Sequence, residues 1–257
     1  MITPNVLGQR IKYFRKLSKM SQFDLENEIG ASAGVISRIE SGKVNPTKET
    51  VRGIAEALEM NNRELDYLIG VTANPPTEEE ANKAIEEIDE YLNKRGSLAY
   101  LLDDRWRFHK VSKFFLKILK LKDTEIDQII GKTTVQVIVD ENLPIIKILS
   151  DEKYEELLRT HIPYYFAQVY FMRDDKSFIE TAKDVQKHPL ANEIWQNLSA
   201  EKTRRFNPQE MRIVHFKVGP FNIPLKFSRE SLFVNSRFEI VEYTPTNELL
   251  KLIAQLN

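Results

Sequence analysis

Three short helical segments separated by tight turns lie within residues 22–60, and this stretch constrains the fold more than any other part of the chain. Apolar residues recur at helical spacing in each segment. Gly30 and Gly42 follow the first two segments, where glycine can take a positive φ without steric cost. We expect the hydroxyls of Ser32 and Thr47 to cap the second and third segments. Two short helices across a glycine turn suit entry into a DNA major groove.

This stretch resembles the helix-turn-helix of the Cro and lambda repressor type, the XRE family. The resemblance covers residues 5–70 and includes polar as well as apolar positions. The matching residues are Gln22, Leu25, Gly30, Ser32, Ile36, Ser37, Ile39, Glu40, Gly42, Lys43, Pro46, Ile54, Ala55 and Leu58. It implies an all-α, DNA-binding domain over residues 1–70 that binds a double-stranded operator. The alternative is a helical packing unit without a nucleic-acid partner.

The resemblance also implies which residues contact DNA. Base readout falls at the exposed start of the second helix, which we expect over residues 33–40. The implied base-reading residues are Ala33, Gly34, Ser37 and Arg38. Those placed for phosphates are Gln22, Ser32, Lys43 and Asn45, and they would position the protein without reading sequence. Only Arg38 can bond guanine bidentately, which is worth roughly 1–3 kcal/mol of discrimination.

Each DNA-binding domain has few base-reading groups. We therefore expect dimerisation and DNA shape to supply much of the specificity. We therefore expect a homodimer. In proteins resembling this one, the residues at Arg15 and Glu40 form an ion pair that ties the first helix to the recognition helix.

Charge is distributed unevenly along the chain. Residues 1–52 hold nine Lys and Arg against five Asp and Glu, a local net charge of +4, whereas all 257 residues sum to −1. Local charge governs phosphate binding, so the overall balance does not oppose DNA contact. There are no cysteines. The four histidines form no recognised metal spacing, and enzyme motifs are absent, which predicts a protein that is not an enzyme. No signal peptide or long apolar run is visible, so we expect a cytoplasmic protein without membrane contact.

Residues 71–96 read as a linker that becomes a connecting helix. Pro75 and Pro76 interrupt regular structure. Thr77 is a helix cap, and three glutamates follow it in the first turn, where negative charge suits the helix dipole. We expect this helix to run to about Arg95.

The pattern of residues 97–257 predicts a second domain with both strands and helices. We therefore expect the chain to be of the α+β class. Two strands that turn at Asp103 and Asp104 come first, helices follow, and three strands come near the end. We expect a five-stranded antiparallel sheet with helices on one face, which is a PAS-like arrangement. A long helical region over 150–173 should be kinked or split at Pro163. A last helix is expected over 247–255.

This second region resembles the MmyB-like ligand-binding domain, a PAS-like sensor found behind such a helix-turn-helix. The residues that carry the resemblance are Tyr100 to Phe115, Arg173-Asp174-Asp175, Pro189, Trp195 and Glu242 to Pro245. Lys110 departs from the pattern, because many PAS domains have Asn after the second strand. The resemblance implies a buried apolar cavity suited to a small apolar ligand such as a fatty acid.

Nine residues are candidates to line such a cavity: Trp106, Phe108, Tyr165, Phe166, Tyr170, Arg173, Trp195, Val214 and Phe216. Arg173 could hold a ligand carboxylate, since a guanidinium matches it bidentately. The plain alternative for the aromatic residues is ordinary core packing. The rival for the whole domain is a surface that binds a protein or peptide partner.

Overall fold

The computed structural model describes residues 3–94, 98–118, 122–143, 151–203, 213–218 and 221–246. The chain divides into two compact units, residues 1–75 and 76–257. We call them the head and the C-terminal unit and describe each by itself.

The head consists of helices. They are α1 (Pro4–Leu17), α2 (Gln22–Glu28), α3 (Val35–Glu40), α4 (Lys48–Ala57) and α5 (Asn62–Ile69). Side-chain caps begin three of them: Ser21 accepts from Asp24 N–H, Thr47 from Thr50 N–H, and Asn61 from Glu64 N–H. Each cap satisfies a backbone donor that the helix leaves unpaired. Fully buried apolar residues of the five helices form one small core, which includes Ile11, Phe14, Leu25, Ile36, Ile54 and Leu68.

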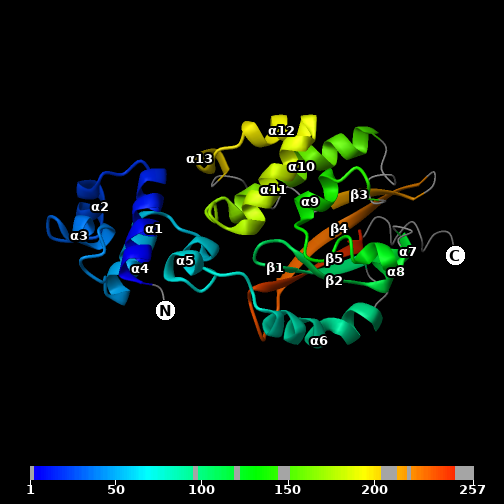
Figure 1. The fold of residues 1–257 in the computed structure, drawn as a ribbon, viewed down its shortest axis with the longest axis horizontal. Coiled ribbons are helices and arrows are strands. Elements are labelled where there is room, and N and C mark those ends of the chain that lie inside the picture. The colour runs from blue at the N-terminus through cyan, green and yellow to red at the C-terminus, as the bar shows by residue number, and fades with distance from the viewer. Residues whose placement is uncertain are drawn as a thin grey trace. The chain divides into compact units, whose positions relative to one another are not determined.

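A five-stranded antiparallel sheet in the order β2-β1-β5-β4-β3 organises the C-terminal unit (Figure 1). Its strands are β1 (Leu98–Asp103), β2 (Phe108–Val111), β3 (Ile213–Val218), β4 (Phe221–Ser231) and β5 (Phe238–Pro245). β1 lies inside the sheet: it pairs with β2 on one side and, through Leu98↔Tyr243 to Asp103↔Phe238, with the central strand β5 on the other. All six residues of β1 are buried, so both faces of the sheet are covered there.

One face of the sheet packs against the helices that lie between β2 and β3. They are α7 (Lys113–Ile118), α8 (Asp123–Ile126), α9 (Thr134–Val139), α10 (Asp151–Val169), α11 (Lys176–Lys187), α12 (Pro189–Gln196) and α13 (Ala200–Thr203). Leu98, Tyr100 and Leu102 point from β1 into this larger core. Side chains alternate between the faces of a strand, so Ala99 and Leu101 point the other way.

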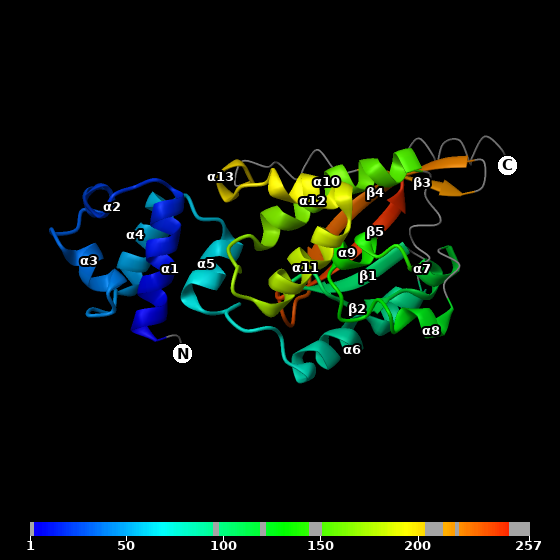
Figure 2. The same ribbon diagram turned by 45° about the horizontal axis from the view of Figure 1, so that its top comes forward.

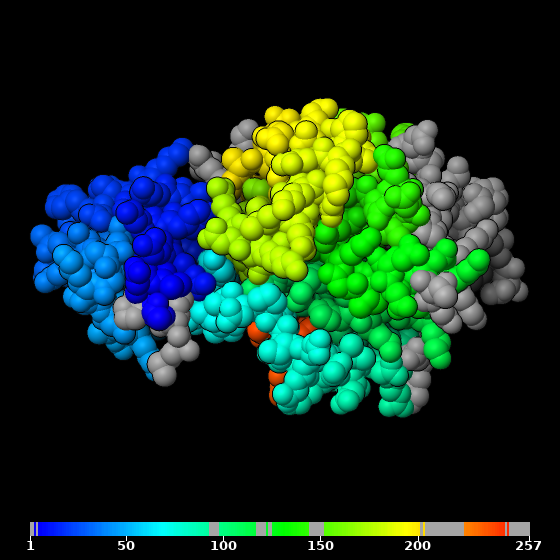
Figure 3. Space-filling model, in the orientation of Figure 1, coloured from blue at the N-terminus to red at the C-terminus, as the bar shows by residue number. Residues whose placement is uncertain are grey.

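The opposite face is covered by α6 (Glu78–Lys94), which corrects the expectation of helices on one face only. Ala84, Ile88 and Leu92 of α6 pack against Ala99 and Leu101 of β1, in a second core. Figures 1 and 2 show α6 on one side of the sheet and α10 to α12 on the other. In Figure 3 the side chains of α6 (cyan) and of α11 and α12 (yellow) form two opposite sides of the unit. The expected connecting helix is therefore a layer of the C-terminal unit, because its apolar side chains pack on the sheet face that the other helices leave open.

Helix α10 continues through Pro163, so the expected split does not occur. Proline removes one backbone donor and disfavours the helical interior. Leu158 and Ile162 before it, and Tyr165 after it, are all fully buried. Their burial against the sheet outweighs the lost hydrogen bond. The helix expected over residues 247–255 lies outside the described residues.

Candidate functional site

Seven of the eight residues predicted to contact DNA are exposed on the head. Ser32, Ala33 and Gly34 form the turn before α3, Ser37 and Arg38 lie on it, and Lys43 and Asn45 follow it. The helix begins at Val35, two residues later than expected, because Gly34 adopts φ +80°. That left-handed conformation suits glycine. The eighth residue, Gln22, is partly buried at the start of α2.

Arg15 of α1 holds the last residue of α3. Its Nε lies 2.6 Å from Oε1 of Glu40, and its Nη2 lies 3.0 Å from Oε2. Both side chains are buried, at 9% and 3% exposed. The ion pair expected from the family resemblance is therefore present. Gln22 Nε2 also donates to Glu40 Oε2 at 2.7 Å, so this predicted phosphate contact is part of the same buried network.

Glu26 of α2 caps the start of α3. Its carboxylate Oε1 accepts a hydrogen bond from Ile36 N–H at 2.9 Å, and the residue is only 5% exposed. Its negative charge also complements the positive end of the helix dipole. The predicted cap, Ser32, is wrong, because the helix starts beyond the reach of its hydroxyl and no side chain of the N-cap residue bonds the helix end. Sequence reasoning missed Glu26, since its acceptor role depends on the angle between two helices.

Gly8 lets α1 approach α3 backbone to backbone. A Cβ at Gly8 would lie 2.2 Å from the carbonyl oxygen of Ile39 and 3.0 Å from the Cα of Glu40. No side chain fits in that space. Together with Arg15 and Glu26, this contact holds α3 at both ends, while Ser37 and Arg38 stay exposed on its outer face.

Arg38 can reach outward from that face. Its Nε donates to the Gly34 carbonyl one turn earlier, at 3.2 Å, a weak contact that leaves the rest of the exposed guanidinium in solvent. Such a group can form two parallel hydrogen bonds to the O6 and N7 atoms of guanine. Lys43, in the turn after α3, is a point charge better suited to a phosphate.

Residues 11–61 match the family model described as Helix-turn-helix. The matched segment includes every residue predicted to contact DNA, together with Arg15, Glu26 and Glu40. A comparison with curated proteins found no match to the chain. The helix-turn-helix match supports a DNA-binding transcription regulator.

In the C-terminal unit, five of the predicted ligand-lining residues form one continuous aromatic series. Ring centroids lie 6.2 Å apart for Trp106 and Tyr165, 6.4 Å for Tyr165 and Trp195, 5.2 Å for Trp195 and Phe166, and 6.2 Å for Phe166 and Tyr170. Trp106, Tyr165 and Trp195 belong to or pack against the core on the helical face of the sheet, and Phe166 packs on Trp195 and Phe178 of neighbouring helices. Their role in ligand binding remains a prediction.

The other four predicted ligand residues are placed differently. Phe108 packs on Tyr100 of β1, with centroids 5.0 Å apart. Arg173 is exposed in the turn between α10 and α11. Val214 and Phe216 lie on β3, but their side chains are outside the described part of the chain.

Arg229 of β4 is a partly buried cation that sequence reasoning missed. Its Nη1 donates to Tyr164 Oη at 2.7 Å, and its Nη2 lies 2.7 Å from a carboxylate oxygen of Glu239. Its guanidinium carbon lies 5.0 Å from the centre of the Trp106 ring. Alternation along β4 could have indicated that Arg229 shares a face with the apolar Leu225 and Phe227, which is an unusual place for arginine.

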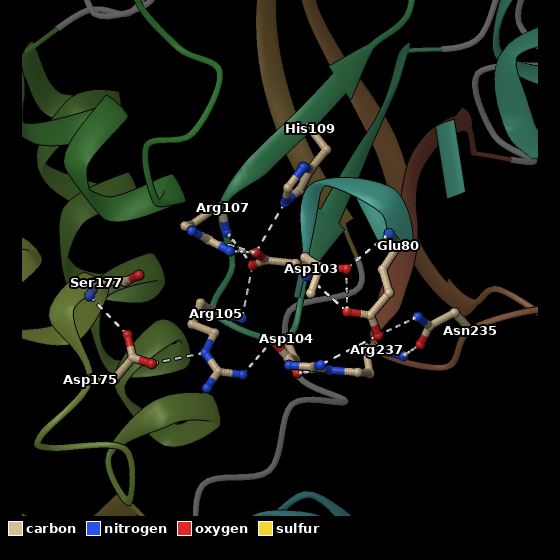
Figure 4. Close-up of polar contacts among 11 residues, drawn as sticks. Glu80, Asp103, Asp104, Arg105, Arg107, His109, Asp175, Ser177, Asn235 and Arg237 are labelled. Carbon is tan, nitrogen blue, oxygen red and sulfur yellow. Dashed lines mark hydrogen bonds and ion pairs between the residues drawn. The ribbon is translucent and has the colours of Figure 1, made fainter. Parts of the chain in front are cut away.

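A second buried polar network surrounds the β1–β2 turn (Figure 4). Asp103 Oδ2 accepts from Arg107 Nε at 2.7 Å and lies 3.0 Å from His109 Nε2. Arg105 pairs with Asp104 at 2.8 Å and with Asp175, the N-cap of α11, at 3.0 Å. Burial opposes ionisation of Asp103, but its hydrogen bonds and the nearby cations lower its pKa overall.

This network continues to the start of α6. Arg237, after the β4–β5 turn, pairs with Asp104 at 2.7 Å and with Glu80 of α6 at 3.6 Å. Asn235 donates to the same glutamate at 3.3 Å. Figure 4 shows these side chains converging from the β1–β2 turn, the β4–β5 turn and α6. The network therefore fixes the beginning of α6 against both turns.

No group of three or more His, Asp or Glu side chains in the described residues could hold a metal ion. Among the same residues, no helix has both the length and the apolar character needed to cross a membrane.

Proposed function

We propose that this chain is a homodimeric, non-enzymatic transcription regulator whose head reads an operator and whose C-terminal unit is a PAS-like sensor of a small apolar ligand. The observation that carries the DNA-binding part is the fixation of α3. Arg15, Glu26 and Gly8 hold both of its ends, while Ser37 and Arg38 remain exposed. A rigid helix with exposed polar groups on one face is what major-groove readout requires.

Two features support the sensor part. Two strands come before a run of helices and three strands follow it, and the five strands form one antiparallel sheet, as in a PAS-like domain. The aromatic series from Trp106 to Tyr170 starts in the core between that sheet and its helices and continues among the helices. Ligand sites in proteins are mostly apolar and aromatic, with a few placed polar groups. A fatty acid is one candidate of this kind.

A protein or peptide partner is the second candidate for the C-terminal unit. Phe233 is 100% exposed and Val234 is 67% exposed, next to each other in the β4–β5 turn. Exposed large apolar side chains favour protein contacts. Orange atoms of the β4–β5 region are visible beside α6 in Figure 3.

The proposed operator binding is tested with two single substitutions. Arg38→Ala should weaken specific binding by roughly 1–3 kcal/mol and flatten the preference at one base pair. Lys43→Ala should weaken binding evenly across sequences and reduce the slope of log affinity against log salt by about 1. Binding-site selection from a random library, followed by titration at several salt concentrations, measures both effects. An unchanged base preference in Arg38→Ala would contradict the proposed orientation of α3.

A further inference from the structure

Two buried N–H donors of the C-terminal unit have no hydrogen-bond acceptor among the residues the structure describes. They are the indole Nε1 of Trp106 and the guanidinium Nε of Arg229. Trp106 is only 2% exposed, so solvent does not reach its indole. Buried donors are almost always paired, because an unpaired donor forfeits its bonds to water without replacement.

The two donors are neighbours, although they come from distant parts of the chain. The guanidinium carbon of Arg229, on β4, lies 5.0 Å from the centroid of the Trp106 ring, between β1 and β2. Both residues contact Tyr164 of α10: its ring lies 5.1 Å from that of Trp106, and its hydroxyl accepts from Arg229 Nη1. The fold thus makes neighbours of the two residues that carry the unsatisfied donors, and both contact the same tyrosine of α10.

Trp106 is held there in an unfavourable backbone conformation. Its φ is +66°, in the left-handed region that bulky residues avoid. Its N–H donates to the Asp103 carbonyl at 2.8 Å, and its carbonyl accepts from Thr134 N–H at 2.9 Å. Such strain persists only where the surroundings impose it, and it clusters at functional sites.

Aromatic rings continue outward from the donor pair. Tyr164 packs on Phe227 at 6.2 Å, and Phe227 packs on Tyr243 at 5.6 Å. Burial raises the pKa of Tyr243 to about 12, so this phenol is neutral at physiological pH. On the side of Tyr164, the neighbours of the two donors are therefore uncharged aromatic rings, apart from Arg229 and its partner Glu239.

The charge of Arg229 is already balanced. Glu239 of β5 lies 2.7 Å from Arg229 Nη2, and its side chain is 13% exposed. A carboxylate ligand at this position would add a second negative charge beside Glu239 in a poorly solvated place, which is unfavourable. An uncharged acceptor would satisfy the two donors without that repulsion. A carbonyl oxygen has two lone pairs and is such an acceptor.

We infer that Trp106 Nε1 and Arg229 Nε form a donor pair that binds an uncharged carbonyl compound with an apolar frame. The inference rests on the proposed sensor function and specifies the ligand class of the sensor. It places recognition of the ligand's polar group at Arg229, beside Trp106 and Tyr164, and not at the exposed Arg173.

The test uses the full-length protein, labelled with ¹⁵N, and three small probes of similar shape. Acetophenone carries a neutral carbonyl, ethylbenzene has no acceptor, and benzoate is charged. The indole resonance of Trp106 and the Nε–H resonance of Arg229 should both move on titration with acetophenone, and both should move further than the indole resonance of Trp195. Acetophenone should bind about tenfold more tightly than ethylbenzene, as expected for one or two additional hydrogen bonds, and more tightly than benzoate.

Two substitutions localise the effect. Arg229→Lys keeps a cation beside Glu239 but removes the Nε donor, and Trp106→Phe keeps an aromatic ring but removes the indole N–H. Each should weaken acetophenone binding about fivefold and leave ethylbenzene binding unchanged. Unchanged ethylbenzene binding also shows that the variant is folded, and each variant tests the inference independently of the other.

Three results would overturn the inference: acetophenone that moves neither resonance, benzoate that binds more tightly than acetophenone, or variants that bind acetophenone as the wild type does. Decanoate that raises the melting temperature without moving either resonance would also overturn it, while keeping the proposed sensor function. If the intact wild-type protein bound no operator, that result would contradict the proposed DNA-binding function and would leave the inference about the ligand class unaffected.

Discussion

The fold lowers the pKa of His161 well below its ordinary value. This histidine lies on α10, where its Nε2 is 2.9 Å from the Thr134 hydroxyl and its ring packs 5.9 Å from that of Trp106. Burial disfavours the charged imidazolium and lowers the pKa of His161 from 6.5 to about 4. The folded protein therefore keeps this side chain neutral in a range where the unfolded chain would protonate it.

Stability should consequently fall as pH decreases from about 6.5 to about 4. In this window the unfolded state binds more protons than the folded state, so the free energy of unfolding rises with pH, by at most about 3 kcal/mol across the whole window. Urea denaturation at pH 7.5 and pH 4.5, for the wild type and for His161→Gln, measures the effect. The wild type should lose more stability on acidification than the variant.

The comparison with the variant removes the contributions of other groups. Asp103 has a lowered pKa, so its stabilisation is lost only at a pH below its ordinary range. Asp104 has a pKa raised by burial, and it titrates alike in both proteins. An equal loss of stability in the wild type and in His161→Gln would show that His161 is not buried in its neutral form.

At the scale of elements, α6 is the first part of the C-terminal unit, because its apolar side chains belong to a core of that unit. Its Ala84, Ile88 and Leu92 are at most 4% exposed and cover Leu101 and Phe238 on the sheet. The polar network from Glu80 to Arg237 and Asp104 fixes its first turn. A fragment that starts after α6 would expose this entire apolar face.

We therefore expect residues 76–257 to form a stable fragment and residues 97–257 to be much less stable. Removing the buried side chains of α6 and exposing their sheet partners should cost at least about 5 kcal/mol. Thermal melting and sedimentation of the two fragments measure the difference, and the shorter one should melt lower and associate. Equal melting temperatures would mean that α6 adds nothing to the fold of the C-terminal unit.

At the scale of the whole molecule, the number of base contacts predicts the oligomeric state. Among the predicted base-reading residues of each head, only Arg38 can bond guanine bidentately. One such contact gives little discrimination, so two heads should act together on half-sites about one helical turn apart. Sedimentation at micromolar concentration and footprinting on a selected operator test this. A monomer that binds one half-site tightly would contradict it.

Much of the head could be predicted from the sequence, because helix caps and glycine turns depend on residues that are close together in the chain. The third helix begins directly after Thr47, whose hydroxyl caps it as expected. Gly30 and Gly42 both adopt positive φ at the turns where they were placed. The family resemblance supplied the Arg15–Glu40 pair, which joins residues 25 positions apart and which spacing alone would not have revealed.

Contacts between distant residues were decided only by the tertiary structure. The cap of α3 comes from Glu26 because two helices meet at a particular angle, and α10 continues through Pro163 because its flanking residues are buried against the sheet. Arg229 contacts Tyr164, 65 positions away, only because β4 and α10 pack against each other in the folded chain. Helical periodicity and capping depend on neighbours along the chain, whereas the partner of a buried charge depends on which distant surfaces the folded chain brings together.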